Sequence, residues 1–268
     1  MNMIFANTVV SNTLASLASS NLISSNLASS TTHNHVDSLA LPVLQQVFDS
    51  HFAHTSAHDL TSLAGLLEQN CRLSQVKALL QAILNTPAQL ATIAKRSYWH
   101  GNGFLKIVLL DQGYKLRLHI WFNGVACEEN IHSHRWGFAS HVLQGALRSE
   151  IWQDGTDNQE QPTIMADEYR YTAKQGDTPA QKAFLHRTPL VKSQDVVQHA
   201  GNTYVMYPHE LHKINHPGDN LVATMICTAP TDSMTNRLFP SSDNPTLSPA
   251  QLTPDELREA IERFLAQC

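Results

Sequence analysis

The chain has 268 residues, of which 42% are hydrophobic and 15% are charged, and its formal net charge is −5. This composition supplies a sizeable core, and it argues against both the basic footprint of a nucleic-acid-binding protein and an acidic tail. No apolar run approaches the roughly 18–20 residues that a membrane-spanning helix needs. The four cysteines are widely spaced, so neither a redox pair nor a zinc knuckle is indicated. We therefore expect reduced thiols and a cytoplasmic protein.

The first 36 residues are rich in Ser, Asn, Ala and Leu, and no Lys or Arg occurs before Arg72. A secretory signal has a positive n-region and a transit peptide contains arginines, so neither is indicated. We predict a disordered, low-complexity segment over residues 1–36. A single domain over residues 37–268 is expected to follow it.

Apolar residues recur at helical spacing in the first part of this domain. The pattern predicts four helices that begin near residues 39, 59, 73 and 86, and the last is expected to end near Arg96. Asp59 is a good N-cap, and Thr86-Pro87 combines a capping residue with proline at the first helical position. This helical part is expected to span residues 37–97. A capping box that starts at Thr253 predicts one more helix over residues 253–267.

The middle of the chain has a different character, because short β-branched or alternating segments are separated by Gly, Asn and Asp. The predicted strands cover residues 105–110, 115–122, 130–134, 138–143, 147–152, 169–172, 183–189, 193–198, 203–207, 212–215 and 221–227. So many short strands favour a β-sandwich or barrel over residues 104–230.

Two separated segments contain histidines at spacings that suit a metal ion. His132 and His134 form an H-x-H pair, and residues i and i+2 of a strand point to one face, about 6.6 Å apart. Two imidazoles at that spacing can converge on one ion at about 2.0–2.1 Å each. His212 opens a later strand, after a turn that contains Pro208. These three histidines are the candidate metal ligands; the alternative is that they are ordinary half-buried histidines of a barrel.

This two-part layout resembles the cupin superfamily, whose first motif is H-x-H followed by Glu and Gly, and whose second is a Gly, a Pro-containing turn and a His followed by Asn. The matching positions here are His132, His134, Gly145, Gly201, Pro208, His212 and Asn215. The resemblance implies a mainly β fold, a cupin or jelly-roll β-barrel with N-terminal helices and a C-terminal helix. Phe138 stands where the superfamily has its Glu ligand, so the site offers three histidines and no carboxylate.

A three-histidine cupin is similar to the cysteine dioxygenase group of thiol dioxygenases. This likeness implies a non-haem Fe(II) dioxygenase whose partners are O₂ and a small polar substrate, such as a thiol or an amino-acid-like molecule. The Arg and Tyr that hold the substrate carboxylate in that family have no counterpart before Asp111, and its Cys–Tyr crosslink has none at Phe138 and Thr228. Arg117 and His119 share a strand face and, if that face is inward, could replace the missing clamp.

Three aromatic residues, Trp136, Phe138 and Tyr207, are further candidates for the substrate pocket, with ordinary core packing as the alternative for the first two. Other functions also fit the motif. Zn(II) or another divalent ion in the same site would favour a non-oxidative isomerase, lyase or hydrolase. A cupin that binds a small ligand without catalysis is a third reading. No nucleic-acid or membrane partner is expected, and a second copy of the chain is a candidate partner.

Overall fold

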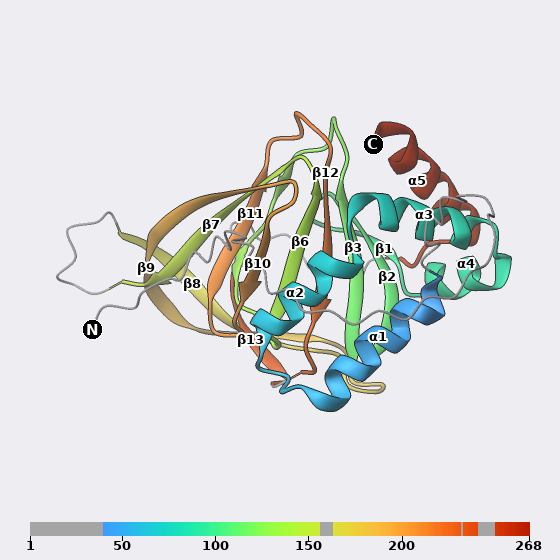
Figure 1. Cartoon of the computed structure of the whole chain (residues 1–268). Helices are drawn as coiled ribbons and strands as arrows, with labels where there is room; N and C mark the ends of the chain where they lie inside the picture. The colour runs from blue at the N-terminus through green and yellow to red at the C-terminus, as the bar shows by residue number, and fades with distance from the viewer. Residues whose placement is uncertain (1–39, 156–162, 232, 241–249) are drawn as a thin grey trace, which may run out of the picture. The chain divides into compact units, whose positions relative to one another are not determined.

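The computed structural model describes residues 40–155, 163–231, 233–240 and 250–268 (Figure 1). The predicted disordered segment, residues 1–36, lies outside this part of the chain. Residues Asp37–Cys268 form one compact unit. Its described part contains helices at both ends and strands between them, which confirms the predicted mainly β fold.

Four helices precede the strands: α1 (Leu41–His54), α2 (Leu60–Asn70), α3 (Leu73–Leu84) and α4 (Pro87–Ala94), and α5 (Pro254–Gln267) follows them. Asp59 caps α2, since its carboxylate accepts a hydrogen bond from the Ser62 N–H at 3.0 Å. The Thr253 hydroxyl caps α5 in the predicted capping box. Thr86 does not cap α4, because its hydroxyl donates back to the carbonyl of Ala82 at 2.9 Å. The helix ends at Ala94, two residues earlier than predicted.

The strands of the described chain form two sheets. The first has the order β1 (Tyr98–His100), β2 (Phe104–Gln112), β3 (Tyr114–Trp121), β12 (Val222–Thr228), β6 (Phe138–Gln144) and β10 (Thr203–Met206). The second has the order β4 (Cys127–Glu128), β11 (Leu211–His216), β5 (Ile131–His132), β13 (Thr235–Phe239), β8 (Thr163–Thr172), β9 (Gln181–His199) and β7 (Ala146–Asp154). Every pairing between these strands is antiparallel.

Six strands of the second sheet close into a ring of pairings. Strand β11 pairs with β5 along one edge and with β7 along the other, while β9, β8 and β13 complete the circuit. The long strands β8 and β9 bow away from the first sheet in Figure 1. His212 lies in this ring with a strand on each side, so its backbone position is fixed from both edges.

The helices cover one face of the first sheet, and the other face points into the barrel. Alternate residues such as Leu105, Ile107 and Leu118 pack with helical residues in one large apolar cluster. Figure 1 shows α1 and α2 in front of β3, β6 and β12. Residues of opposite parity, such as Phe104, form smaller clusters with residues of the second sheet, including Ile214. Because strand side chains alternate between faces, the two sets separate the helical interface from the barrel interior.

Several strand boundaries differ from the prediction. The strands predicted over residues 183–189 and 193–198 are one strand, because Lys192 and Gln194 pair with the consecutive residues Trp152 and Ile151, and a bulge at Ser193 in β9 absorbs the extra residue. The strand predicted over residues 130–134 ends at His132, since the next N–H, that of Ser133, donates to Arg237 at 3.0 Å. Strands β1, β4 and β13 were not predicted.

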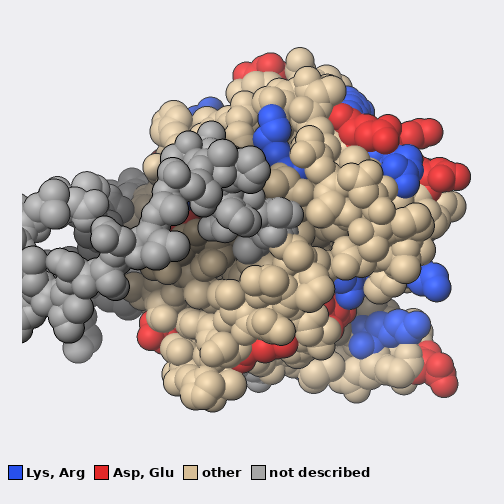
Figure 2. All heavy atoms as spheres, turned by 45° about the vertical axis from the view of Figure 1, so that its right-hand side comes forward, with Lys and Arg blue, Asp and Glu red and all other residues tan. Residues whose placement is uncertain are grey.

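The described helices include none that is long and apolar enough to cross a bilayer. On the face shown in Figure 2, acidic and basic side chains of the described residues are scattered and intermingled. Cys71, Cys127, Cys227 and Cys268 are free thiols, as the spacing predicted.

Candidate metal centre

Three imidazoles converge at one end of β5 and β11. His132 on β5 lies directly opposite His212 on β11, and His134 follows two residues after His132. The ring centroids of His132 and His134 are 4.7 Å apart, those of His132 and His212 4.8 Å, and those of His134 and His212 5.0 Å. Their potential ligand atoms all lie within 4.8 Å of one another. Among the described residues this is the one such cluster, and it contains the three histidines predicted from the sequence.

Backbone hydrogen bonds from two other segments hold the H-x-H pair. The N–H of His134 donates to the carbonyl of Pro208 at 3.1 Å, which ties the first motif to the turn before β11. Between the two histidines, the Ser133 N–H donates to the Arg237 carbonyl, and the Arg237 N–H donates back to the Ser133 hydroxyl, each at 3.0 Å. The two motifs are therefore joined to each other and to β13 by main-chain contacts.

The protonation states of the three rings suit metal ligation. His132 Nδ1 lies 2.8 Å from the Asn130 carbonyl, which can only accept, so Nδ1 donates there and Nε2 is the ring atom that faces the cluster as a potential ligand. Burial, with the neighbouring imidazoles and the charges of Lys106 and Arg117, lowers the pKa of His134 well below its ordinary value. Burial does the same for the pKa of His212. Neutral rings keep the lone pair that a metal ion needs.

The spacing of two ligand atoms fits a coordination shell. His134 Nε2 and His212 Nε2 are 2.9 Å apart. Two nitrogens that each lie about 2.1 Å from one ion, at nearly a right angle, are separated by about 3 Å. His212 Nδ1 is buried and has no hydrogen-bond partner among the described residues. His212 therefore lacks the kind of hydrogen bond to a carbonyl that orients the ring of His132.

No carboxylate of the described chain joins the three histidines. The Phe138 ring lies 5.0 Å from that of His134, edge to face, so this position presents an apolar ring to the cluster. Glu150 is engaged elsewhere, since it accepts from the indole of Trp152 at 3.1 Å and pairs with Lys213 at 3.7 Å. Glu129 is buried, and its carboxylate accepts from the backbone N–H of Ile214 at 3.1 Å. The donor set of the cluster is therefore neutral.

Arg117 and His119 lie on the inner face of β3, as their possible role requires. Both are buried, and Arg117 Nε and His119 Nε2 have no hydrogen-bond partner in the described part of the chain. The Arg117 guanidinium lies 5.1 Å from the ring centre of Trp136, and the Trp136 ring is in turn 5.8 Å from that of His134. Four of the five predicted pocket residues, Arg117, His119, Trp136 and Phe138, thus lie on the inner side of the barrel, and Phe138 and Trp136 are the ones whose rings are near that of His134.

Tyr207 and His141 point elsewhere. Tyr207 is 42% exposed and stacks on His209 with 6.1 Å between ring centres, so its side chain lies on the turn and not in the interior. His141 lies on the helical face of β6, where its Nδ1 is 2.7 Å from the hydroxyl of Thr203. Its parity is opposite to that of Phe138, which agrees with the expectation that it faces away from the cluster.

The sequence reasoning missed Lys106 of β2 and Thr224 of β12, which also line the interior, as does Tyr204 of β10. Lys106 pairs with His119 across β2 and β3, and Thr224 pairs with His119 on the other side. Burial raises the pKa of Tyr204 to about 12. The available signal was the lysine itself, a charged residue in the otherwise apolar run from Phe104 to Leu110.

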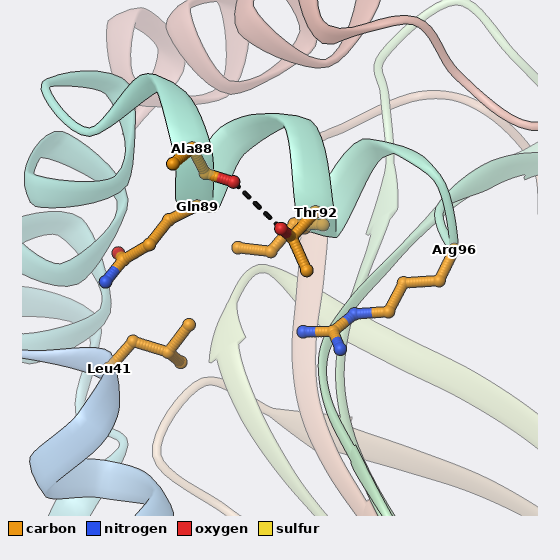
Figure 3. Close-up of a pocket in the computed structure, with 6 residues that line it drawn as sticks. Leu41, Ala88, Gln89, Thr92 and Arg96 are labelled. Carbon is orange, nitrogen blue, oxygen red and sulfur yellow. Dashed lines mark hydrogen bonds between the residues drawn. The ribbon is translucent and has the colours of Figure 1, made fainter.

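A cavity lies on the helical layer between α1 and α4, away from the histidine cluster (Figure 3). It measures about 230 Å³ and is lined by Leu41, Ala88, Gln89, Thr92, Ile93 and Arg96. The Arg96 guanidinium donates to the carbonyls of Val108 and Leu109, so its charge is used to attach α4 to β2. Thr92 donates to the carbonyl of Ala88 within the same helix. This pocket contains no group of converging ligands.

Comparison with known proteins gives matches at the level of structure alone. No protein-family profile matches the chain, and neither does any curated protein sequence. An RmlC-like cupin from Shewanella frigidimarina is 15% identical, with a TM-score of 0.31, over 50% of this chain and 83% of that one. An RmlC-like cupin from Ralstonia eutropha is 14% identical, with a TM-score of 0.30, over 62% and 75%. Hydroquinone 1,2-dioxygenase from a Sphingomonas species is 8% identical, with a TM-score of 0.29, over 46% and 64%.

The first two of these structures are named as RmlC-like cupins, and all three are distant from this chain. At this level of similarity their substrates and reactions say nothing about this chain. We therefore infer the function from the geometry of the chain's own residues.

Proposed function

We propose that this protein is a metal-dependent enzyme of the three-histidine cupin type, and specifically a non-haem Fe(II) dioxygenase similar to the thiol dioxygenases. His132, His134 and His212 would hold the ion. The observation that carries the proposal is the converging donor set without a carboxylate: three imidazoles whose potential ligand atoms lie within 4.8 Å of one another, and an apolar ring beside them. Such a set leaves the full charge of a divalent ion uncompensated and, for iron, about three coordination positions open.

A ferrous ion in this site would supply the open positions and the redox chemistry with O₂. The protein's own residues would supply orientation and a dry interior. Phe138 and Trp136 border the cluster with aromatic surface, which limits the entry of water. Arg117 and His119 present unpartnered N–H groups toward a small polar substrate.

Metal analysis of the full chain tests the site. We expect near-stoichiometric metal in the wild type and its loss in His132→Ala and in His212→Ala. His141→Ala is the matched control, because this histidine is about as buried as His212 but lies on the helical face of β6. Metal that persists in both ligand variants would refute the assignment.

The identity of the metal tests the reaction. Iron, together with O₂ uptake that depends on both His132 and His212, would support the dioxygenase. Zinc at the same stoichiometry, without O₂ uptake after reconstitution with iron, would refute it in favour of a non-oxidative enzyme. A screen of small thiols, amines and carboxylic acids for O₂ uptake would then define the substrate.

A further inference from the structure

The barrel interior carries two cationic side chains that no acidic group pairs with. Lys106 on β2 and Arg117 on β3 belong to the inner faces of neighbouring strands. Lys106 pairs with His119, two residues from Arg117, so the two cations are diagonal neighbours with Cβ atoms roughly 7–8 Å apart. Within the described chain, neither forms an ion pair within 4.0 Å. Like charges at such positions repel each other unless an anion lies between them.

The carboxylates that could neutralise this pair are already occupied. Glu129 exerts its charge on Lys106, but its carboxylate accepts the Ile214 N–H and is not within ion-pair distance of the lysine. Asp111 exerts its charge on Arg117, but it pairs with Lys115 at 2.5 Å. The pair therefore keeps a net positive charge in the barrel interior, where a charge is costly without a partner.

Several buried polar atoms on or beside these two cations have no hydrogen-bond partner among the described residues. These atoms are Arg117 Nε, His119 Nε2 and Thr224 Oγ1. Thr224 and His119 are direct cross-strand partners, so the atoms line one patch of the inner wall. Buried polar groups are nearly always satisfied, and a group that is not points to a missing ligand or water.

We propose that Lys106 and Arg117, with His119 and Thr224, form a carboxylate-binding site, and that the substrate is a small carboxylic acid. This inference deepens the proposed function, on which it rests for the identity of the bound molecule as substrate. The Arg117 fork matches a planar carboxylate in two hydrogen bonds. The aromatic rings of Phe104 and Trp136 lie beside the two cations, within 5.4 Å of the Lys106 ammonium and 5.1 Å of the Arg117 guanidinium. Such surroundings suit a flat carboxylate on a short carbon chain better than a tetrahedral phosphate, which needs more donors.

Calorimetric titration of the metal-free full chain with malonate tests the site apart from the metal. Malonamide, which has the same shape without charge, and inorganic phosphate are the comparison ligands. We expect malonate to bind with a stoichiometry of one, and Lys106→Met and Arg117→Met each to weaken it roughly 10- to 100-fold. Lys95→Met is the matched control, because this lysine is exposed at the end of α4. Should Arg117→Met fail to fold, Arg117→Lys keeps the charge without the fork and is expected to bind with intermediate affinity.

His212→Ala separates this inference from the proposed function. We expect this variant to lose metal but to keep its affinity for malonate, because His212 is not part of the cationic patch, which consists of Lys106, Arg117, His119 and Thr224. The inference would be overturned if malonate did not bind, or if it bound no better than malonamide or less tightly than phosphate. It would also be overturned if Lys106→Met and Arg117→Met both left the affinity for malonate unchanged. Failure of the proposed function would appear instead as metal content that is independent of His132 and His212.

Discussion

Replacing Lys106 by methionine is expected to make the protein more stable. The lysine has no ion-pair partner among the described residues, and burial, together with the charge of Arg117, lowers its pKa from 10.5 to about 7. In the unfolded chain the ammonium is fully hydrated and has its ordinary pKa. Folding at neutral pH must therefore either bury this charge or release its proton. Methionine has a similar length and removes that penalty.

The penalty follows from the difference in pKa. A decrease from 10.5 to about 7 corresponds to an upper bound of about 5 kcal/mol, at about 1.4 kcal/mol for each pH unit. Part of the Lys106 side chain still reaches solvent, which screens its charge, so we expect roughly half of this value. Urea unfolding at pH 7 should give Lys106→Met a free energy of unfolding about 2–3 kcal/mol above that of the wild type.

The pH dependence provides the stricter test. Between pH 7 and about pH 10.5 the unfolded state binds more protons at this lysine than the folded state, so wild-type stability rises with pH. Above about pH 10.5 both states are neutral and the penalty has vanished. The advantage of Lys106→Met should therefore be largest at pH 7 and shrink toward pH 10, relative to Lys95→Met. An advantage that is absent at pH 7, or that does not change with pH, would refute the argument that an uncompensated charge is buried here.

Three further perturbations have definite expected outcomes. Ser133→Ala leaves the Arg237 N–H without its acceptor and should lower the free energy of unfolding by about 1–3 kcal/mol in urea, whereas Ser133→Thr should retain stability. Gly145→Ala places a methyl group 2.3 Å from the Leu221 carbonyl at φ +74°, so it should cost about 2 kcal/mol more than Gly113→Ala, where φ is +77° and the space is open. Equal losses in the two glycine variants would contradict the steric argument. Chelation should lower the thermal midpoint of the wild type by an amount that corresponds to about 3 kcal/mol for a metal at 100 times its Kd, and should leave His132→Ala unchanged.

The helices could be predicted from the sequence because their determinants are local. Asp59 and Thr253 bond to N–H groups within three residues, and the apolar stripes lie within single helices. Thr86 failed as a cap because its hydroxyl found the carbonyl of Ala82, four residues back. A propensity for capping does not determine which of two nearby partners is chosen.

The strands that escaped prediction depend on distant partners. Strand β1 exists because Tyr98 pairs with Lys106, and β13 because Leu238 lies between His132 and Tyr169. Neither segment has an alternating pattern long enough to indicate a strand by itself. Strand β9 is continuous because it stays paired with β7 on both sides of a bulge at Ser193, and its own sequence does not reveal this pairing.

The histidine cluster was accessible from the sequence because its spacing implied the geometry. The H-x-H pair and His212 meet across adjacent strands, and the parity of Phe138 and His141 places them on opposite faces. Only part of the cationic patch could be predicted from the sequence. Arg117 and His119 share a face of one strand, but Lys106 enters the patch through the register of β2 on β3, and register is a property of the folded sheet.

The histidine cluster and the cationic patch would bind ligands of opposite charge. The three imidazoles offer neutral ligands, so a divalent ion would bring two positive charges into a space that already contains Lys106 and Arg117. The charges of these two residues already reach His134 and help to lower its pKa, so they would also oppose a metal ion at that position. A bound carboxylate would relieve both repulsions at once. Because coupling between two ligands is reciprocal, metal and carboxylate should each strengthen the binding of the other by the same factor. A site of this kind holds its ion most tightly when the acid is present, which favours loading of the metal together with the molecule on which it would act.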